Sequence, residues 1–281
     1  MPNKIFNRPL YRRQLRKGMQ YVNSLASAGR VIDNRLLDHI IDLCIFTISD
    51  MTKKFESVLM YGHWYINQGM QSQMKLEDGQ REHHLVISNA VGNSLKSLEI
   101  DPLKQAAASV IFDEELMPFQ NNMFNLVISN LSLNFTNDFV SVLASYKAAL
   151  KDGGLLIINI VGGASLHNLR DAMAYADLYC HNGIGNRIAP MLQPAILANC
   201  AQNCGFSSVM VEREVLAYRF QDWTTMLEIL RYWGQGGCMI GEELAFCGEF
   251  RCKVEEYYMM ISKEDGGIWD EFEILTLFAV K

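Results

Sequence analysis

Long hydrophobic runs are missing from this sequence. Its longest apolar segments, of which residues 155–161 are typical, are short and are interrupted by polar residues such as Asn159. A membrane-spanning helix needs roughly 18 or more consecutive apolar residues. We therefore expect no transmembrane segment.

The sequence also lacks the features of an export signal. Its first twenty residues contain neither the apolar stretch nor the small-residue cleavage site of a secretory signal. The seven cysteines are odd in number and scattered along the chain, which favours reduced thiols over a disulfide framework. Together these observations predict a cytoplasmic protein.

No metal-ligand pattern stands out among the cysteines and histidines. Cys200 and Cys204 lie one helical turn apart and offer two thiolates, but no second Cys or His pair with ligand spacing accompanies them. We interpret both as buried thiols and predict no metal site.

The charge argues against bulk nucleic-acid binding, because the chain carries a net charge of −6 at pH 7. The charge is uneven, since the first twenty residues hold basic side chains and no acid. Two interpretations of this basic arm stay open: a solvated, amphipathic lead-in helix, or a docking arm for an acidic partner or a membrane surface. The basic residues of the arm are Lys4, Arg8, Arg12, Arg13, Arg16 and Lys17.

What the chain does have is enough apolar surface for a core: 49% of its 281 residues are hydrophobic and 20% are charged. Its length favours one large domain, and it shows no internal repeat, low-complexity tract or Ser/Gly linker. We expect residues 1–55 to form a basic arm and helical cap, and residues 56–281 to form the main domain. Residues from about 214 to 270 read as a helical insertion in that domain.

Hydrophobic periodicity predicts an α/β fold. Residues 34–48 carry one apolar stripe at helical spacing, and short apolar runs follow that are separated by helix-length connections. Runs without polar alternation indicate strands buried on both faces, which is typical of a parallel, doubly wound sheet. The predicted strands are 57–61, 84–88, 109–112, 124–129, 155–160, 208–212 and 271–280, seven in all, and helices are predicted at 193–204 and 223–233.

Two motifs in the middle of the chain carry a family resemblance. Asp113-Glu114-Glu115-Leu116-Met117-Pro118-Phe119 precedes the predicted strand 124–129, and Leu150-Lys151-Asp152-Gly153-Gly154 follows it. In order and spacing this resembles a class I S-adenosylmethionine (SAM) dependent methyltransferase. The resemblance implies a seven-stranded, Rossmann-like sheet, with an N-terminal helical cap and a helical insertion before the last strand.

The resemblance narrows to the branch that contains complex I (NADH dehydrogenase) assembly factor 5 and the malonyl-carrier O-methyltransferase of biotin synthesis. The opening segment from Ile5 to Arg13 is similar to that branch, as are the segments at 161–170 and 187–190 and the closing strand. This implies a protein substrate or a respiratory-complex subunit as partner.

In such a fold the cofactor lies across the carboxyl ends of the parallel strands. The resemblance implies cofactor contacts from a glycine-rich turn after the first strand, an acid ending the second and an acid ending the third. It assigns the cofactor site to Gly62, Asn89, Asp113, Glu114 and Asn130. Glycines at 64 and 66 and acids at 60 and 89 are replaced by Trp64, Ile66, Met60 and Asn89, which predicts weak or absent SAM binding.

The acceptor side of the resemblance falls on Leu131, Asn134 and Gly163. Asn134 stands where the branch usually has His, and Ala164 stands where it has Asp. A neutral Asn cannot act as a general base, so the sequence assigns no catalytic residue.

Two functions remain open from the sequence. The first is a SAM-dependent enzyme that modifies a protein side chain or a carrier-bound acid. The alternative is a catalytically degenerate protein that keeps the fold and serves as a non-enzymatic assembly or binding factor. The direction of the Trp64 side chain, into the cofactor cleft or away from it, would discriminate between them.

Overall fold

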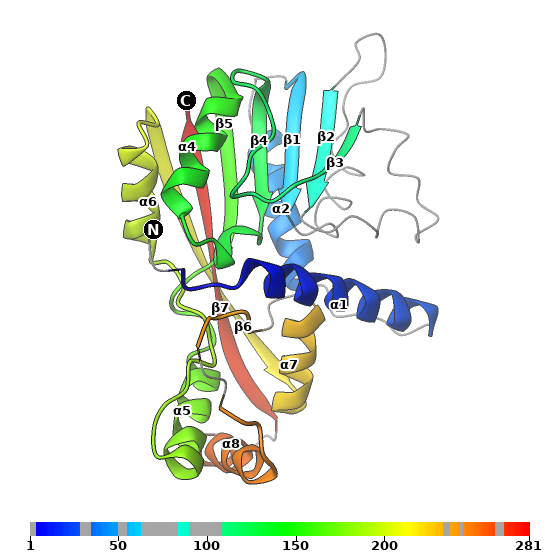
Figure 1. Ribbon diagram of the computed structural model, residues 1–281, viewed down its shortest axis with the longest axis vertical. Helices are drawn as coiled ribbons and strands as arrows, with labels where there is room; N and C mark the ends of the chain where they lie inside the picture. The colour runs from blue at the N-terminus through cyan, green and yellow to red at the C-terminus, as the bar shows by residue number, and fades with distance from the viewer. Residues whose placement is uncertain are drawn as a thin grey trace.

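The computed structural model describes residues 4–28, 35–49, 55–62, 84–89, 108–232, 237–241, 244–261 and 267–281. One mixed sheet organises them, with the strand order β3-β2-β1-β4-β5-β7-β6 (Figure 1). The pairs among β1 to β5 are all parallel, whereas β7 is antiparallel to both of its neighbours. The strands are β1 (Ser57–Gly62), β2 (His84–Asn89), β3 (Ala108–Ile111), β4 (Phe124–Asn130), β5 (Leu150–Val161), β6 (Ser208–Phe220) and β7 (Ile268–Val280).

The sheet is covered on both faces, and this confirms the predicted α/β class. Successive residues of β1 point to opposite sides, with Met60 in one buried cluster and Leu59 in the other. The cluster of Met60 includes the apolar stripe of α2 (Arg35–Ser49), the helix predicted at 34–48. The cluster of Leu59 includes residues of α4 (Phe139–Ala149) and α6 (Pro194–Asn203) on the other face (Figure 1).

The last three strands are longer than the sequence predicts, and β7 begins at Ile268 instead of residue 271. β6 continues to Phe220, past residue 212 and into the segment expected to be an insertion, and it pairs with β7 along its whole length. β6 is an edge strand whose side chains alternate between exposed and half-buried, so it has no continuous apolar run to reveal it. β5 begins at Leu150 instead of residue 155, because Leu150 pairs with Phe124 of β4 before an irregularity in the register.

A helical lobe stands beyond the main body of the sheet, where β6 and β7 extend as a two-stranded ribbon (Figure 1). α5 (His167–His181) packs on α8 (Gly248–Ile261) there, and α7 (Trp223–Tyr232) follows β6. The first helix, α1 (Arg8–Ser27), runs across the carboxyl ends of the parallel strands (Figure 1). Of the helices that the structure describes, none is long and apolar enough to cross a membrane.

Candidate functional site

The strand register gathers the predicted cofactor residues at one edge of the sheet. Gly62 ends β1 and is paired with Asn130, the last residue of β4. Asn89 ends β2 and is paired with Ile111, and Asp113 follows two residues later. Because these strands are parallel, their carboxyl ends meet at the same edge, which is where ligands bind in open α/β sheets.

Gly62 is required by the backbone at this edge. Its φ angle is +110°, and a Cβ atom at this position would lie 2.1 Å from the carbonyl oxygen of Asn130. Only glycine, which lacks a Cβ atom, can adopt this conformation so close to the Asn130 backbone. The chain therefore leaves β1 with bare backbone against β4. Trp64, whose direction was to discriminate between the two functions, lies outside the described residues, as does Ile66.

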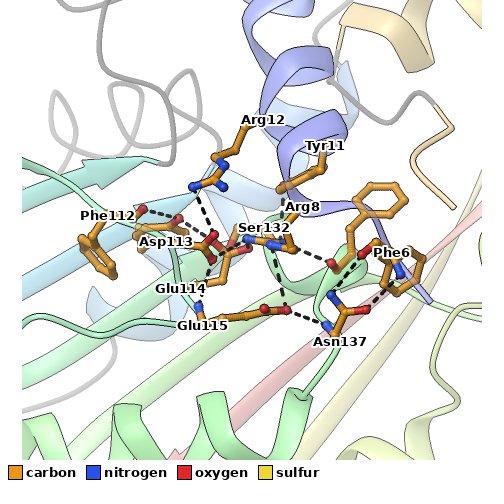
Figure 2. Close-up of polar contacts among 12 residues, drawn as sticks. Phe6, Arg8, Tyr11, Arg12, Phe112, Asp113, Glu114, Glu115, Ser132 and Asn137 are labelled. Atoms are coloured by element: carbon orange, nitrogen blue, oxygen red, sulfur yellow. Dashed lines mark hydrogen bonds and ion pairs between the residues drawn. The ribbon is translucent and has the colours of Figure 1, made fainter. Parts of the chain in front are cut away.

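The acidic segment 113–115 is folded into the protein and is not a solvated loop. The Glu114 side chain is fully buried, and the Asp113 side chain is 10% exposed. Nη2 of Arg8, the first residue of α1, lies 2.8 Å from Asp113 Oδ1 and 2.7 Å from Glu114 Oε1 (Figure 2). Nη1 of Arg8 donates to the carbonyl oxygen of Phe135 at 3.0 Å. The basic arm is thus docked on the acid that follows β3.

Tyr61 of β1 completes this buried ion cluster. Its hydroxyl donates a 2.5 Å hydrogen bond to Glu114 Oε2 and lies 3.0 Å from the carbonyl oxygen of Phe112. Burial raises the pKa of Glu114, and the Arg8 charge opposes that rise. Burial, together with the neighbouring Glu114 charge, raises the pKa of Tyr61 well above its usual range. Burial lowers the pKa of Arg8, but Glu114 and Asp113 outweigh it, so Arg8 stays charged.

Further contacts hold the arm beside the cluster. Oδ1 of Asn137 accepts 2.9 Å hydrogen bonds from the backbone N–H groups of Ile5 and Phe6 (Figure 2). The backbone N–H of Asn137 in turn donates to Oε1 of Glu115 at 2.7 Å. The Phe6 ring packs edge-to-face on Phe135 with centroids 5.5 Å apart. Residues 5–12 are therefore a docked part of the fold, which corrects the interpretation of the arm as a solvated lead-in.

Asn130 is buried, and its side chain lies on the face of the sheet that α2 covers. Its Oδ1 accepts a 2.6 Å hydrogen bond from Nδ2 of Asn159 on β5, and this Nδ2 also lies 3.1 Å from Sγ of Cys44 on α2. The next residue, Leu131, has a φ angle of +50° and donates its N–H to the carbonyl oxygen of Asn159. Its side chain is buried in the core. Asn130 and Leu131 are therefore buried residues at the carboxyl end of β4 that are both bonded to Asn159 of β5.

Asn134 and Gly163 lie at the end of β5. Asn134 donates from Nδ2 to the carbonyl oxygen of Val161 at 3.0 Å and accepts the Val161 N–H at 3.4 Å. Gly163 donates its N–H to the carbonyl oxygen of Leu192. The short helix η3 (Leu133–Phe135) connects this group to the ion cluster, since Phe135 accepts from Arg8. Both groups are therefore parts of one edge.

The sequence analysis did not find Arg8, Tyr61 or Asn137 as site residues. The one signal for the Arg8 pairing was the opposite charge of the arm and of the 113–115 segment. Among the residues that the structure describes, no group of three or more His, Cys, Asp and Glu side chains is placed to hold a metal ion. Cys200 and Cys204 are free thiols that are only half-buried, which corrects the prediction that both are buried.

The architecture defines a class I methyltransferase-type fold. A Bacillus halodurans protein described as a "putative methyltransferase" has the same fold, with a TM-score of 0.54 over 85% of this chain and 97% of that structure at 13% identity. Residues 81–158 match the family described as "Methyltransferase domain".

Comparison of whole sequences makes the relationship more particular. The chain is similar to "Arginine-hydroxylase NDUFAF5, mitochondrial" of Danio rerio, at 27% identity over 70% of this chain. It is also similar to "Malonyl-[acyl-carrier protein] O-methyltransferase" of Xylella fastidiosa, at 26% identity over 44% of this chain and 40% of that protein. The match spans 61%, 56% and 55% of the length of the zebrafish, mouse and human arginine-hydroxylases.

Proposed function

We propose that the chain binds SAM at the carboxyl edge of β1, β2 and β3 and acts as a transferase on a protein side chain or a carrier-bound acid. The observation that carries this proposal is the Asp113 carboxylate, which Arg8 holds in place at the same carboxyl edge of the sheet as the turn at Gly62. SAM supplies an electrophilic methyl group when bound. The proposed cofactor residues are Gly62, Asn89, Asp113, Glu114 and Asn130, and the proposed acceptor side is Leu131, Asn134 and Gly163.

Each cofactor residue has a separate role in this proposal. Gly62 offers bare backbone for close approach, and Asp113 offers a carboxylate for the adenine amine. Glu114 supports the site indirectly, because its two oxygens already contact Tyr61 and Arg8. Asn89 accepts one hydrogen bond from the ribose without charge assistance, which costs on the order of 1 kcal/mol relative to an acid. We therefore propose weak SAM binding.

The division of the chain belongs to the same proposal. Residues 1–55 serve as an arm and cap, and residues 56–281 serve as the methyltransferase-like domain with its helical insertion before β7. All seven cysteines are free thiols. A reducing compartment such as the cytoplasm is consistent with them.

A second candidate, a non-enzymatic assembly or binding factor, is favoured by one observation. Both polar groups of the Asn134 amide are engaged with the backbone of Val161. Asn134 thus has a structural role, and it does not act as the base that removes a proton from an acceptor. The relatives include an arginine-hydroxylase and a methyltransferase whose name specifies an acyl-carrier protein. We propose a macromolecular partner under either candidate function.

Isothermal titration with SAM and its demethylated product, S-adenosylhomocysteine, tests the proposal. We expect a dissociation constant below about 100 μM, equivalent to about 5.5 kcal/mol of binding free energy. Asp113→Asn should weaken binding at least about tenfold, because a neutral amide replaces a charged acceptor. Asp152→Asn is the matched control, since the Asp152 side chain is 97% exposed. No heat from folded protein at millimolar ligand would contradict SAM binding and favour the second candidate.

A further inference from the structure

The two oxygens of the Asp113 carboxylate have different partners. Oδ1 accepts from Nη2 of Arg8 at 2.8 Å and from the backbone N–H of Glu115 at 3.1 Å. Oδ2 faces Nη1 of Arg12 at 3.5 Å, and this is its one contact recorded in the described part of the chain (Figure 2). Oδ1 is therefore fixed by two close donors, whereas Oδ2 has one distant partner.

The two arginines are held with very different strength. The Arg8 side chain is 7% exposed, bonds the carbonyl oxygen of Phe135 and stacks over the Tyr11 ring at 4.8 Å. The Arg12 side chain is 38% exposed and makes a long ion pair that water and salt can screen. Both belong to α1 and lie four residues apart, so they project from the same face of the helix. One helix therefore places two guanidiniums on the Asp113 carboxylate: Arg8, which is firmly held, and Arg12, which is weakly held.

We propose that Arg8 is a positioning residue that turns Oδ2 of Asp113 outward, and that Arg12 is a displaceable occupant of Oδ2 that an adenine amine must replace. This inference rests on the proposed function, because it assumes an adenosine ligand at Asp113. The ligand chemistry is an exocyclic amine that donates to a carboxylate, the same chemistry that the Arg12 guanidinium offers. Docking of α1 thus has two effects: Arg8 orients the Asp113 carboxylate, and Arg12 occupies Oδ2 until the ligand replaces it.

The charges around Asp113 support this division of roles. Asp113, Glu114 and Glu115 bring three carboxylates to the two guanidiniums, so loss of the Arg12 contact leaves Asp113 paired with Arg8. Loss of Arg8, in contrast, leaves Glu114 fully buried and without its ion pair. Arg12 is therefore the member that can leave at low cost.

The test is isothermal titration of the full chain with S-adenosylhomocysteine and with its deaminated inosine analogue, which lacks the amine. We expect Arg12→Gln to tighten S-adenosylhomocysteine binding about 2- to 5-fold, as expected for removal of a competing exposed ion pair. The same variant should leave binding of the inosine analogue unchanged. Raising the salt concentration from about 50 to about 500 mM should tighten binding to the wild type and not to Arg12→Gln. Arg13→Gln, an exposed charge on the same helix, is the matched control.

Arg8 is tested by its effect on discrimination between the two ligands. Arg8→Gln should weaken S-adenosylhomocysteine binding at least about tenfold and abolish the preference for the amine. Arg8→Lys keeps the charge without the planar fork, and it should recover part of that preference in a protein whose melting temperature shows it to be folded.

Each outcome decides the inference. If the wild type binds and Arg12→Gln binds equally or more weakly, Arg12 is not a competitor and the inference is wrong while the proposed function stands. If only Arg12→Gln binds, the inference is supported and the arm closes the site in the wild type. If neither protein binds at millimolar ligand, the proposed function is wrong and the inference is wrong with it.

Discussion

Thr276 on β7 donates a 2.8 Å hydrogen bond to Oδ1 of Asn159 on β5, deep in the sheet. Since Oδ1 is used as an acceptor, the Asn159 amide must turn its Nδ2 toward Oδ1 of Asn130 on β4. Three neighbouring strands are thus tied by one directed chain of hydrogen bonds. This chain of hydrogen bonds reaches Asn130, whose backbone carbonyl oxygen limits the space beside Gly62.

Removing the Thr276 hydroxyl should destabilise the fold. Thr276→Val keeps the shape of the side chain but leaves Oδ1 of the buried Asn159 without this donor, which should cost about 1 to 3 kcal/mol. The free energy of unfolding in urea measures the change. Ser207→Ala is the control, because its exposed hydroxyl bonds the Val280 carbonyl at the sheet edge, and it should change stability by no more than about 0.5 kcal/mol. Equal effects of the two variants would contradict this account.

Gly62 should tolerate no side chain. Gly62→Ala combines an unfavourable positive φ with a Cβ atom 2.1 Å from the Asn130 oxygen, so β1 and β4 must separate. We expect a loss of about 2 to 5 kcal/mol in unfolding free energy, measured by denaturant or by melting temperature. Gly248→Ala, where an added Cβ meets nothing within 4 Å, should stay within about 1 kcal/mol of the wild type. A Gly62→Ala protein as stable as the wild type would show that β1 and β4 can separate at Gly62 and Asn130 at little cost.

The helical lobe should depend on Arg187 and Asp177. Nη2 of Arg187 lies 2.6 Å from Oδ1 of the fully buried Asp177, and its guanidinium stacks 4.0 Å from the Phe250 ring. Arg187→Met leaves a buried carboxylate without its ion pair, which should cost about 3 to 5 kcal/mol. The double variant Asp177→Asn with Arg187→Met should cost less than the sum of the two single changes, since Asn still accepts the N–H of Gly185. Strict additivity in urea denaturation would exclude the coupling.

Stability should fall at alkaline pH through Cys44. Burial raises the pKa of its thiol from 9.0 to about 11. The folded protein therefore holds this proton more tightly than the unfolded chain, so the unfolding free energy falls as pH rises from 9 to 11. This one group accounts for up to about 2 to 3 kcal/mol, at 1.36 kcal/mol per pH unit.

Denaturation at several pH values checks this prediction. Cys44→Ala should be less stable at neutral pH but show a shallower decline above pH 9. Val58→Ala opens a cavity in the same buried cluster without removing a thiol, so it should lose stability and keep the wild-type slope. Identical slopes in all three proteins would show that Cys44 does not carry the alkaline transition.

The sequence by itself determined the elements whose burial follows a local pattern of apolar residues. The apolar stripe of α2 and the runs of β1 and β4 are local patterns, and each was predicted to within about one residue, as buried strands and amphipathic helices allow. The motif around Asp113 likewise indicated the methyltransferase-type fold. The length of β6 escaped prediction, because an edge strand alternates in burial and owes its last residues to pairing with β7.

Only the tertiary structure decided what the charged residues do. Arg8 and Arg12 belong to a run of basic residues with no local feature to separate them, yet Arg8 is buried against Asp113 and Arg12 is partly exposed. Arg8 and Asp113 are 105 positions apart, and their pairing exists because α1 crosses the carboxyl ends of the parallel strands. Burial and Coulomb energy depend on distance in space, which hydrophobic periodicity along the chain does not encode.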